Sequence, residues 1–398
     1  MSAEVHIDTF DTTPRDGAQS LPAENQFREG SKYEIVDRIA AFGIDVIEAG
    51  FPASRDREGS LTDFEEFQET ARMMKEPIEV KTWQNGEQTG VVHRVPAIAG
   101  LTGVNPEHIE LTWEALAGAV NPRVHTFIST DAKHMAEKFP GKTPDQVLQM
   151  GVGGIRIAQK LSAEDPNSTI EASAEAASTT ADSFLERVTK SFVAEGIDVF
   201  NAPDTVGEEY PFEMFKRYMK VISWVHSVNP NVVISGHNHN DGGNANANTL
   251  ALVYAAVAYA REHDVKVHIQ AETTICGLGE RAGNADIFPF AAGLFKFFGK
   301  DIDVPVNWRL NPGFAVDTAN EVMAYGNMEV HRQNPIVGRD TNVHRSGIHS
   351  DGVVKGGHRV YTPHDPTFWG HESDAVHEDG KYQGRRGRAA INSRSNKG

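Results

Sequence analysis

Short apolar segments, each followed by a helix-like segment, recur along the first 300 residues, and this alternation restricts the possible folds more than any other feature. Runs of about four to eight apolar or alternating residues predict strands, whereas apolar residues spaced three and four apart predict helices. Strands are expected at residues 5–9, 45–52, 95–101, 124–129, 169–172, 199–205, 231–236 and 265–271. Helices are expected between them, for example at 33–42, 63–74, 184–195 and 212–225.

Two α/β architectures fit this alternation: a closed (β/α)8, or TIM, barrel and an open doubly wound sheet. The strand ends favour the barrel, because most finish in polar side chains: Asp16, Glu48, His125, Glu171, Thr205 and His237. In a barrel, the carboxyl ends of the strands surround one site. We therefore predict a TIM barrel over residues 1–300, followed by a linker and a small, mostly helical C-terminal subdomain over residues 301–398.

A pair of histidines follows the seventh strand, in the sequence HNHND at residues 237–241. His237 and His239 point the same way if the strand continues, because strand side chains alternate between faces. Two neighbouring imidazoles can hold one divalent metal, although two polar residues that cap a strand would give the same pattern. Asp16 would add a carboxylate, and an Asp/His/His set leaves coordination positions open. Zinc, manganese and magnesium are all compatible with such ligands.

Charge and cysteine content limit the setting and the partners of the protein. The net charge of −17 argues against nucleic acids and anionic membranes as partners. The single cysteine, Cys276, excludes an internal disulfide and a cysteine-rich zinc site, and is typical of a reducing cytoplasm. The N-terminus lacks the pattern of a signal peptide, and no apolar run approaches the roughly 18 residues of a membrane span. A cytoplasmic location is expected.

Several motifs carry a resemblance to a known family. DTTPRDG at 11–17, HNHND at 237–241 and GLGERAGN at 277–284 resemble signatures of the 2-isopropylmalate synthase/homocitrate synthase family. This family is the Claisen-condensing branch of the DRE-TIM metallolyases. IEAGFP at 47–52, HTF at 125–127, PDTVG at 203–207, SGIH at 346–349 and YTP at 361–363 are further similarities. The resemblance covers most of residues 5–370, in order.

The resemblance implies that acetyl-CoA, as co-substrate, condenses with a 2-oxo acid in a homodimer that shares its active sites. The implied metal ligands are Asp16, His237 and His239, with Asn284 in or near the shell. The implied catalytic residues are Arg15, Glu280, His349 and Tyr361, with His349 as the base. The implied substrate contacts are Gln19, Glu48, His125, Glu171 and Thr205, and Gly277 and Gly279 would bind the cofactor. Arg15 would equally be satisfied by pairing with Glu48, and Glu171 by a structural role.

Several activities are compatible with this resemblance. The 2-isopropylmalate synthase reaction (acetyl-CoA, 2-oxoisovalerate and water giving 2-isopropylmalate and CoA) is favoured by the segments FPAS, HTFI and PDTVG. Homocitrate, Re-type citrate, citramalate and phosphonomethylmalate synthases share the machinery and remain alternatives. A related acyl-CoA lyase is disfavoured, because similar lyases carry a cysteine where Glu280 and Arg281 stand. A non-catalytic metal-binding barrel is disfavoured by the acid/base set of Arg15, Glu280 and His349.

Two segments fit the alternation poorly. Residues 76–94 look like an insertion before the third strand, and we expect a solvated loop there. Residues 301–312 are expected to be a linker. The sequence ends soon after Ile391, where many relatives continue, so no regulatory domain is expected.

Overall fold

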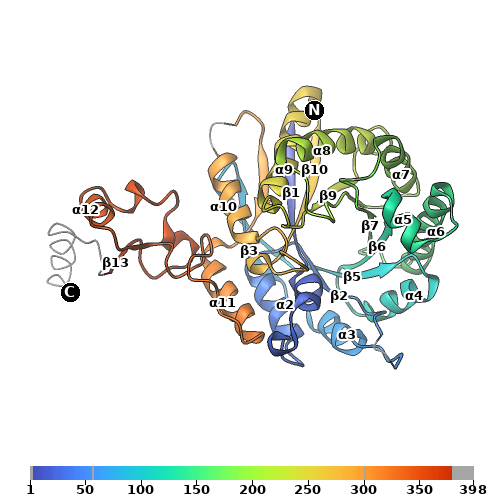
Figure 1. The fold of residues 1–398 in the computed structure, drawn as a ribbon, viewed down its shortest axis with the longest axis horizontal. Helices are drawn as coiled ribbons and strands as arrows, with labels where there is room; N and C mark the ends of the chain where they lie inside the picture. Colours follow the sequence, from blue (N-terminus) through green and yellow to red (C-terminus); the bar gives the residue numbers. More distant parts are fainter. Residues whose placement is uncertain (1–2, 56–57, 300–301, 379–398) are drawn as a thin grey trace. The chain divides into compact units, whose positions relative to one another are not determined.

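Eight parallel strands close into a barrel in the computed structural model, which describes residues 3–55, 58–299 and 302–378 (Figure 1). β1 pairs with β10 along its whole length, from Glu4 opposite Lys266 to Asp11 opposite Thr273. This pairing joins the first and last barrel strands and rules out the open sheet. The barrel strands are β1 (Glu4–Asp11), β2 (Val46–Gly50), β5 (Ala97–Gly103), β6 (Pro122–Ser129), β7 (Thr169–Glu175), β8 (Val199–Asn201), β9 (Val233–His237) and β10 (Lys266–Thr273).

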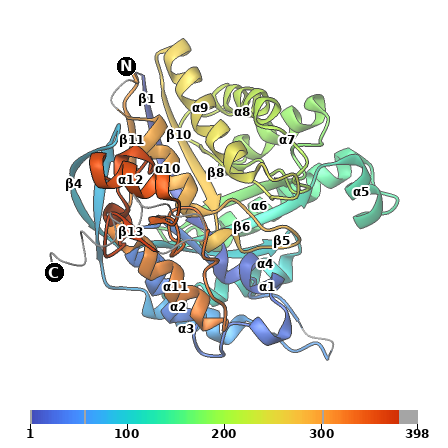
Figure 2. The ribbon, with the colours of Figure 1, turned by 60° about the vertical axis from the view of Figure 1, so that its left-hand side comes forward.

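Helices surround the barrel (Figure 2), and they carry buried apolar residues on one face. In α2, for example, Ile35, Val36 and Ile39 are buried, and Gly43 follows with the positive φ of 100° that suits a glycine after a helix. Within the described residues, no helix has both the length and the apolar character needed to cross a membrane. The main helices are α2 (Lys32–Ala41), α3 (Phe64–Met73), α4 (Pro106–Ala115), α6 (Pro144–Ser162), α7 (Asp182–Ala194), α8 (Pro211–His226), α9 (Ala245–His263) and α10 (Ile287–Phe297), with the shorter α1 (Ala18–Ser20) and α5 (Ala132–Lys138).

The insertion at residues 76–94 is a β-hairpin, so the expectation of a solvated loop is wrong. β3 (Ile78–Gln84) and β4 (Glu87–Arg94) pair antiparallel, and β3 also pairs with β11 (Val306–Arg309), which in turn pairs with β1. The turn residues Asn85 and Gly86 both have positive φ, the conformation that an Asn-Gly hairpin turn requires. β11 likewise shows that the expected linker at 301–312 contains a strand.

Trp83 is the side chain that fixes this hairpin to the barrel. Its ring contacts Phe295 edge-on at 4.8 Å between centroids, its Nε1–H donates to the Leu310 carbonyl at 2.9 Å, and it is 7% exposed. We expect Trp83→Ala to lower the free energy of unfolding by about 3–5 kcal/mol, because it leaves a cavity and an unpaired carbonyl. Urea unfolding would measure the change. Val91→Ala, on the exposed face of β4, is the matched control and should change it by about 0.5 kcal/mol or less. Equal effects would contradict a fixing role for Trp83.

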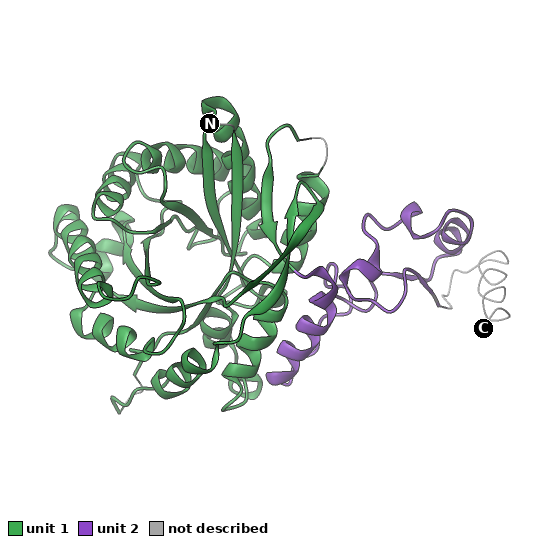
Figure 3. Ribbon diagram, turned by 180° about the vertical axis from the view of Figure 1, so that it is seen from behind, with its two compact units in different colours: residues 1–310 green, residues 311–398 purple. Residues whose placement is uncertain are grey.

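The chain divides into two units, residues 1–310 and residues 311–398 (Figure 3). The division falls ten residues after the expected boundary at residue 300, because β11 belongs to the barrel sheet. The described part of the second unit contains α11 (Ala315–Tyr325), α12 (Gly347–Gly356) and a short parallel pair of strands, β12 (Val343–His344) and β13 (Val376–His377). Residues 379–398 of the expected subdomain lie outside the described residues.

Candidate metal centre and active site

Three of the predicted metal ligands meet at the carboxyl ends of the barrel strands. Asp16 lies in the helical turn that follows β1, His237 is the last residue of β9, and His239 comes two residues later. One ligand atom from each lies within 4.8 Å of the others, and the two Nε2 atoms are 3.1 Å apart. All three side chains are buried. The arrangement is that of a candidate Asp/His/His metal site.

The donor atoms of this cluster suit a divalent cation. His239 Nδ1 and Asn284 Oδ1 are buried and have no hydrogen-bond partner among the described residues. Burial and, after it, the neighbouring His237 lower the pKa of His239 to about 3, so its imidazole is neutral and can ligate. Burial raises the pKa of Asp16, but Arg15 and His237 outweigh it and hold that pKa below its usual value. The Asn284 amide donates to Asp16, so Asn284 lies beside the cluster.

Glu272, which the sequence analysis missed, orients the first histidine. Its Oε2 lies 3.1 Å from His237 Nδ1, and its Oε1 accepts a hydrogen bond of 3.0 Å from Ser235. A carboxylate at Nδ1 keeps the proton there and leaves Nε2 free for a metal. Burial is the largest influence and raises the pKa of Glu272, but the hydrogen bond from His237 and the positive charges of His237 and His125 together outweigh it and lower the pKa. The residue stands at a strand end, so the rule applied to the other strands would have found it.

Glu272→Gln should weaken metal binding about 10–100-fold, because an amide no longer fixes the tautomer and orientation of His237. Zinc titration against a competing chelator measures the affinity. Glu262→Gln, on the exposed end of α9, changes the net charge equally and should leave the affinity unchanged. Identical affinities for the two variants would show that Glu272 plays no part in positioning the ligand.

Arg15 is held beside the metal ligands by two carboxylates. Its Nε donates to Glu48 at 2.6 Å, and its Nη1 donates to Asp16 at 2.8 Å. Glu48 also contacts His125 Nδ1 at 2.7 Å and accepts a hydrogen bond of 2.7 Å from Thr12. The Arg15–Glu48 pair considered in the sequence analysis therefore exists, and it fixes the guanidinium in place at the site.

The buried charged side chains of Arg15, Glu48 and His125 stabilise one another. Burial raises the pKa of Glu48, but Arg15 and His125 outweigh it and hold that pKa well below its usual value. Burial lowers the pKa of His125, but Glu171 and Glu48 outweigh it and raise the pKa to about 9. His125 is therefore a cation at neutral pH. Arg15 and His125 are thus two fixed positive side chains beside the metal ligands.

Glu171 lies in the same barrel interior and is bonded on both oxygens. It accepts from Arg123 at 3.2 Å and from Gln270 at 2.9 Å. Burial is the main cause of its raised pKa. Ser173 links this region to the site, because its hydroxyl contacts His125 Nε2 at 2.7 Å and accepts from Asn201 at 2.9 Å. The negative charge of Glu171 also raises the pKa of His125, and so it stabilises the charged form of that histidine.

The loop after β10 closes over the cluster and has room only for glycine at one position. A Cβ on Gly279 would overlap the Asn284 amide and come within 3.0 Å of Asp16 Oδ2. Gly277 has a φ of 72°, a conformation natural to glycine. Glu280 is exposed on this loop.

Arg281 connects the loop to the neighbouring segments. It bonds both oxygens of Asp241 at 2.9 Å and the carbonyl oxygen of Thr205 at 2.7 Å. The Thr205 hydroxyl accepts from the Ala176 backbone N–H at 3.0 Å, so the hydroxyl supports the turn after β7. The sequence analysis gave no role to Asp241 or Arg281, although both lie inside motifs that it singled out.

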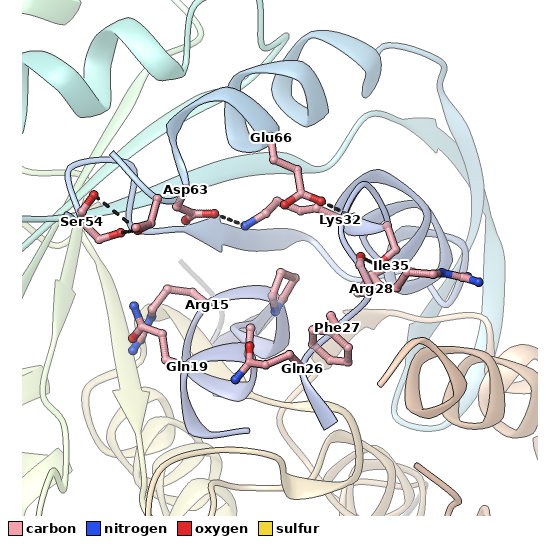
Figure 4. Close-up of a pocket in the computed structure, with 14 residues that line it drawn as sticks. Arg15, Gln19, Gln26, Phe27, Arg28, Lys32, Ile35, Ser54, Asp63 and Glu66 are labelled. Atoms are coloured by element: carbon pink, nitrogen blue, oxygen red, sulfur yellow. Dashed lines mark hydrogen bonds and ion pairs between the residues drawn. The ribbon is translucent and has the colours of Figure 1, made fainter. Parts of the chain in front are cut away.

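Gln19 lines a pocket of about 310 Å³ beside Arg15 (Figure 4). Lys32 closes another side of this pocket, donating to the Ala49 carbonyl at 2.8 Å and pairing with Asp63. The pocket therefore adjoins the metal cluster through Arg15. The remaining lining residues come from the turn after β1 and from α1, α2, α3 and their connections: Pro14, Ala18, Gln26, Phe27, Arg28, Ser31, Ile35, Ser54, Thr62 and Glu66.

His349 and Tyr361 lie together in the second unit. Their rings are stacked, with centroids 3.9 Å apart and planes inclined by 12°, and the ring of His344 lies 6.0 Å from that of His349. His349 is exposed, and Tyr361 is 40% exposed. The structure thus brings these two predicted catalytic residues together, whereas Arg15 and Glu280 belong to the first unit.

A closed eight-stranded barrel with an Asp/His/His cluster at the carboxyl ends of its strands defines a TIM barrel with a candidate divalent-metal site. The HMGL-like family model matches residues 6–297. The chain belongs to the HMGL-like family.

The curated relatives include 2-isopropylmalate synthases. The enzyme of Nitratidesulfovibrio vulgaris is 36% identical over 355 residues, which are 88% of this chain and 59% of that protein. The chloroplastic 2-isopropylmalate synthase 2 of Arabidopsis thaliana is 32% identical over 365 residues, or 90% of this chain and 52% of that protein. The chain thus spans between about half and three fifths of these relatives.

The similar solved structures include HMG-CoA lyases. The lyase of Acinetobacter baumannii, in complex with coenzyme A and 3-methylmalate, superimposes with a TM-score of 0.61 and 17% identity. The match covers 85% of this chain and 96% of the lyase. At this identity the likeness supports the barrel fold alone.

Proposed function

We propose that the protein catalyses an acetyl-CoA-dependent Claisen condensation with a 2-oxo acid, and specifically the 2-isopropylmalate synthase reaction. The supporting observation is the buried Asp16/His237/His239 cluster beside Arg15, in a chain whose curated relatives include 2-isopropylmalate synthases. Acetyl-CoA, 2-oxoisovalerate and water would give 2-isopropylmalate and CoA. The cytoplasm is the proposed location, in keeping with the single cysteine.

Each group at the site has a proposed role in this reaction. A divalent metal held by Asp16, His237 and His239 would polarise the ketone of the oxo acid. Arg15, fixed by its carboxylate partners, offers its charge to the oxygen that becomes negative during attack. His349 takes a proton from the acetyl methyl group.

Three further residues assist in this proposal. Glu280 orients His349 for the proton transfer. Tyr361 holds the plane of the His349 ring by stacking on it. Gly279 lets the loop approach the metal ligands closely, since a side chain there would overlap Asn284.

The charges inside the barrel favour an oxo acid with an uncharged side chain. Arg15, Arg123 and His125 are each already bonded to a buried carboxylate. A second carboxylate on the substrate, as in 2-oxoglutarate or oxaloacetate, would have to compete for these cations. 2-Oxoisovalerate and pyruvate avoid this cost. Of these two acids, 2-oxoisovalerate should be preferred, because burial of its additional methyl groups stabilises the bound state. The expected gain is about 1–3 kcal/mol for each carbon that the pocket buries.

CoA release tests the proposal. Purified protein, acetyl-CoA and a divalent metal are combined with 2-oxoisovalerate, 2-oxoglutarate, pyruvate, oxaloacetate or phosphonopyruvate, and free thiol is followed. The highest kcat/KM is expected with 2-oxoisovalerate. A higher value with another acid would replace the proposed substrate and keep the condensation. The absence of thiol release with all five acids would contradict the proposed function.

A homodimer with shared active sites is part of the proposal, with His349 entering the barrel of the partner. Mixing Asp16→Ala chains with His349→Ala chains, under conditions that exchange subunits, should restore CoA release, because one site of the mixed dimer is complete. Each variant alone is the control. If mixed dimers form, as native mass spectrometry would show, and remain inactive, the sites are not shared.

A further inference from the structure

A second group of metal-ligating side chains lies at the opposite end of the barrel, where the strands begin. His6 and Asp8 are two residues apart on β1 and share a face of that strand. His268, on β10, is the direct cross-strand partner of His6. The two imidazole rings are 4.7 Å apart and nearly perpendicular. Two paired strands therefore hold all three side chains.

Both imidazoles point at one carboxylate. His6 Nε2 lies 3.4 Å from Asp8 Oδ1, and His268 Nε2 lies 2.9 Å from Asp8 Oδ2. Zinc with nitrogen and oxygen ligands at about 2.0–2.1 Å in a tetrahedron needs ligand atoms about 3.3 Å apart. The two distances above run to different oxygens of Asp8, and one ligand atom from each of the three residues lies within 4.8 Å of the others, so a small closure of the side chains would reach that spacing. The side chains of His6 and His268 are 35% and 36% exposed, so an ion and a completing water can enter.

Arg309 is the charged group that would compete with a cation here. Its Nη2 pairs with Asp8 Oδ1, while its Nε donates to Asp45 at 2.6 Å. Arg309 can therefore give up Asp8 and keep a carboxylate partner. Asp45 also pairs with Arg94, so this end of the barrel holds two arginines and two aspartates. A hydrogen-bonded network without metal is the alternative arrangement.

We propose that His6, Asp8 and His268 bind a zinc-type divalent cation, separately from the catalytic cluster. The ligand set of two histidines and one carboxylate, in a partly exposed position on rigid strands, matches that of zinc sites with an open position. β1 and β10 are the first and last strands of the barrel, and their pairing closes it. A cation bound here connects them and stabilises the closed barrel.

Zinc stoichiometry tests the site in the full chain. The protein is stripped with a chelator and titrated with zinc chloride, and bound zinc is measured after equilibrium dialysis. We expect two equivalents for the unmodified chain, one for His239→Ala, and none for His239→Ala combined with His268→Gln. Zinc should also raise the Tm of His239→Ala, and this shift should vanish in the double variant.

Control variants keep the test decisive. His93→Gln in the His239→Ala background removes another exposed strand histidine that faces a carboxylate, Glu79, and should leave one equivalent. His6→Gln replaces His268→Gln if circular dichroism shows that the latter is unfolded. Retention of one equivalent in the folded double variant, or its absence from His239→Ala, would overturn the proposal. Binding of cobalt in place of zinc should give the visible absorption of a tetrahedral site in His239→Ala and not in the double variant.

Discussion

Replacing His239 with alanine should remove the catalytic metal and slow CoA release more than about a hundredfold, because loss of a direct ligand costs more than the 10–100-fold typical of an outer partner. Asp16 and His237 would remain, but two protein ligands hold a divalent cation weakly. The substitution leaves the hydrogen bond between His237 and Glu272 in place, so the local strand geometry is kept. The fold itself should therefore survive.

Metal analysis and kinetics together check this expectation. The variant should contain one equivalent of metal fewer than the unmodified chain, with an unchanged circular dichroism spectrum. His263→Ala removes an exposed histidine at the last residue of α9 and should alter neither quantity. Unreduced turnover of the His239→Ala variant in metal-supplemented buffer would reject His239 as a ligand.

Replacing His349 with alanine should lower turnover about 10²–10⁴-fold, the usual contribution of a positioned general base. The side chain is exposed and stacks on Tyr361, so its removal should not disturb the core of the second unit. Binding of the 2-oxo acid should be unchanged, since the proposed acid-binding groups all lie in the barrel. Lower turnover with unchanged binding of the 2-oxo acid is the result expected for a general base and not for a residue that binds the acid.

Two measurements distinguish these outcomes. Thiol release gives turnover, and calorimetric titration with 2-oxoisovalerate gives binding in the absence of acetyl-CoA. His331→Ala, another exposed histidine of the second unit, is the matched control and should behave like the unmodified chain. If His349→Ala turned over at the unmodified rate, the proton would have to go to a different group.

Much of the site could be predicted because, in a barrel, the polar residues at the carboxyl ends of the strands surround one site. Each of the eight predicted segments contains or overlaps a barrel strand, and the polar residues within or after them gave Asp16, Glu48, His125 and His237. Glu272 was missed because the rule was not applied to the last strand, although Glu272 directly follows its predicted end at Ala271 and lies within β10, which continues to Thr273. β8 is shorter than predicted, because the predicted strand runs to residue 205 whereas β8 ends at Asn201. The residues after it leave the ladder and form loop contacts, which include the support that Thr205 gives to Ala176.

Other features depend on contacts that no local pattern encodes. The bonds from Arg281 to Asp241 and Thr205 join segments far apart in the sequence and arise from loop packing. The same holds for β11, whose four residues pair with β1 and β3 across the whole length of the barrel sequence. The hairpin at 76–94 is different, because its Asn85-Gly86 turn is a recognisable local signal that the exposed, polar composition obscured.

The pairing of β1 with β10 has a consequence for the order in which the chain folds. The edge of β1 that β10 covers has no partner until residues 266–273 have been synthesised, so a nascent chain exposes an unpaired strand edge for most of its length. Contacts between residues this far apart in sequence also form slowly, because a long loop must close first. Asp16 and the two histidines are separated by the same long loop. A probe that detects their approach would therefore report the last stage of folding, and chaperone dependence during synthesis would be greatest before that stage.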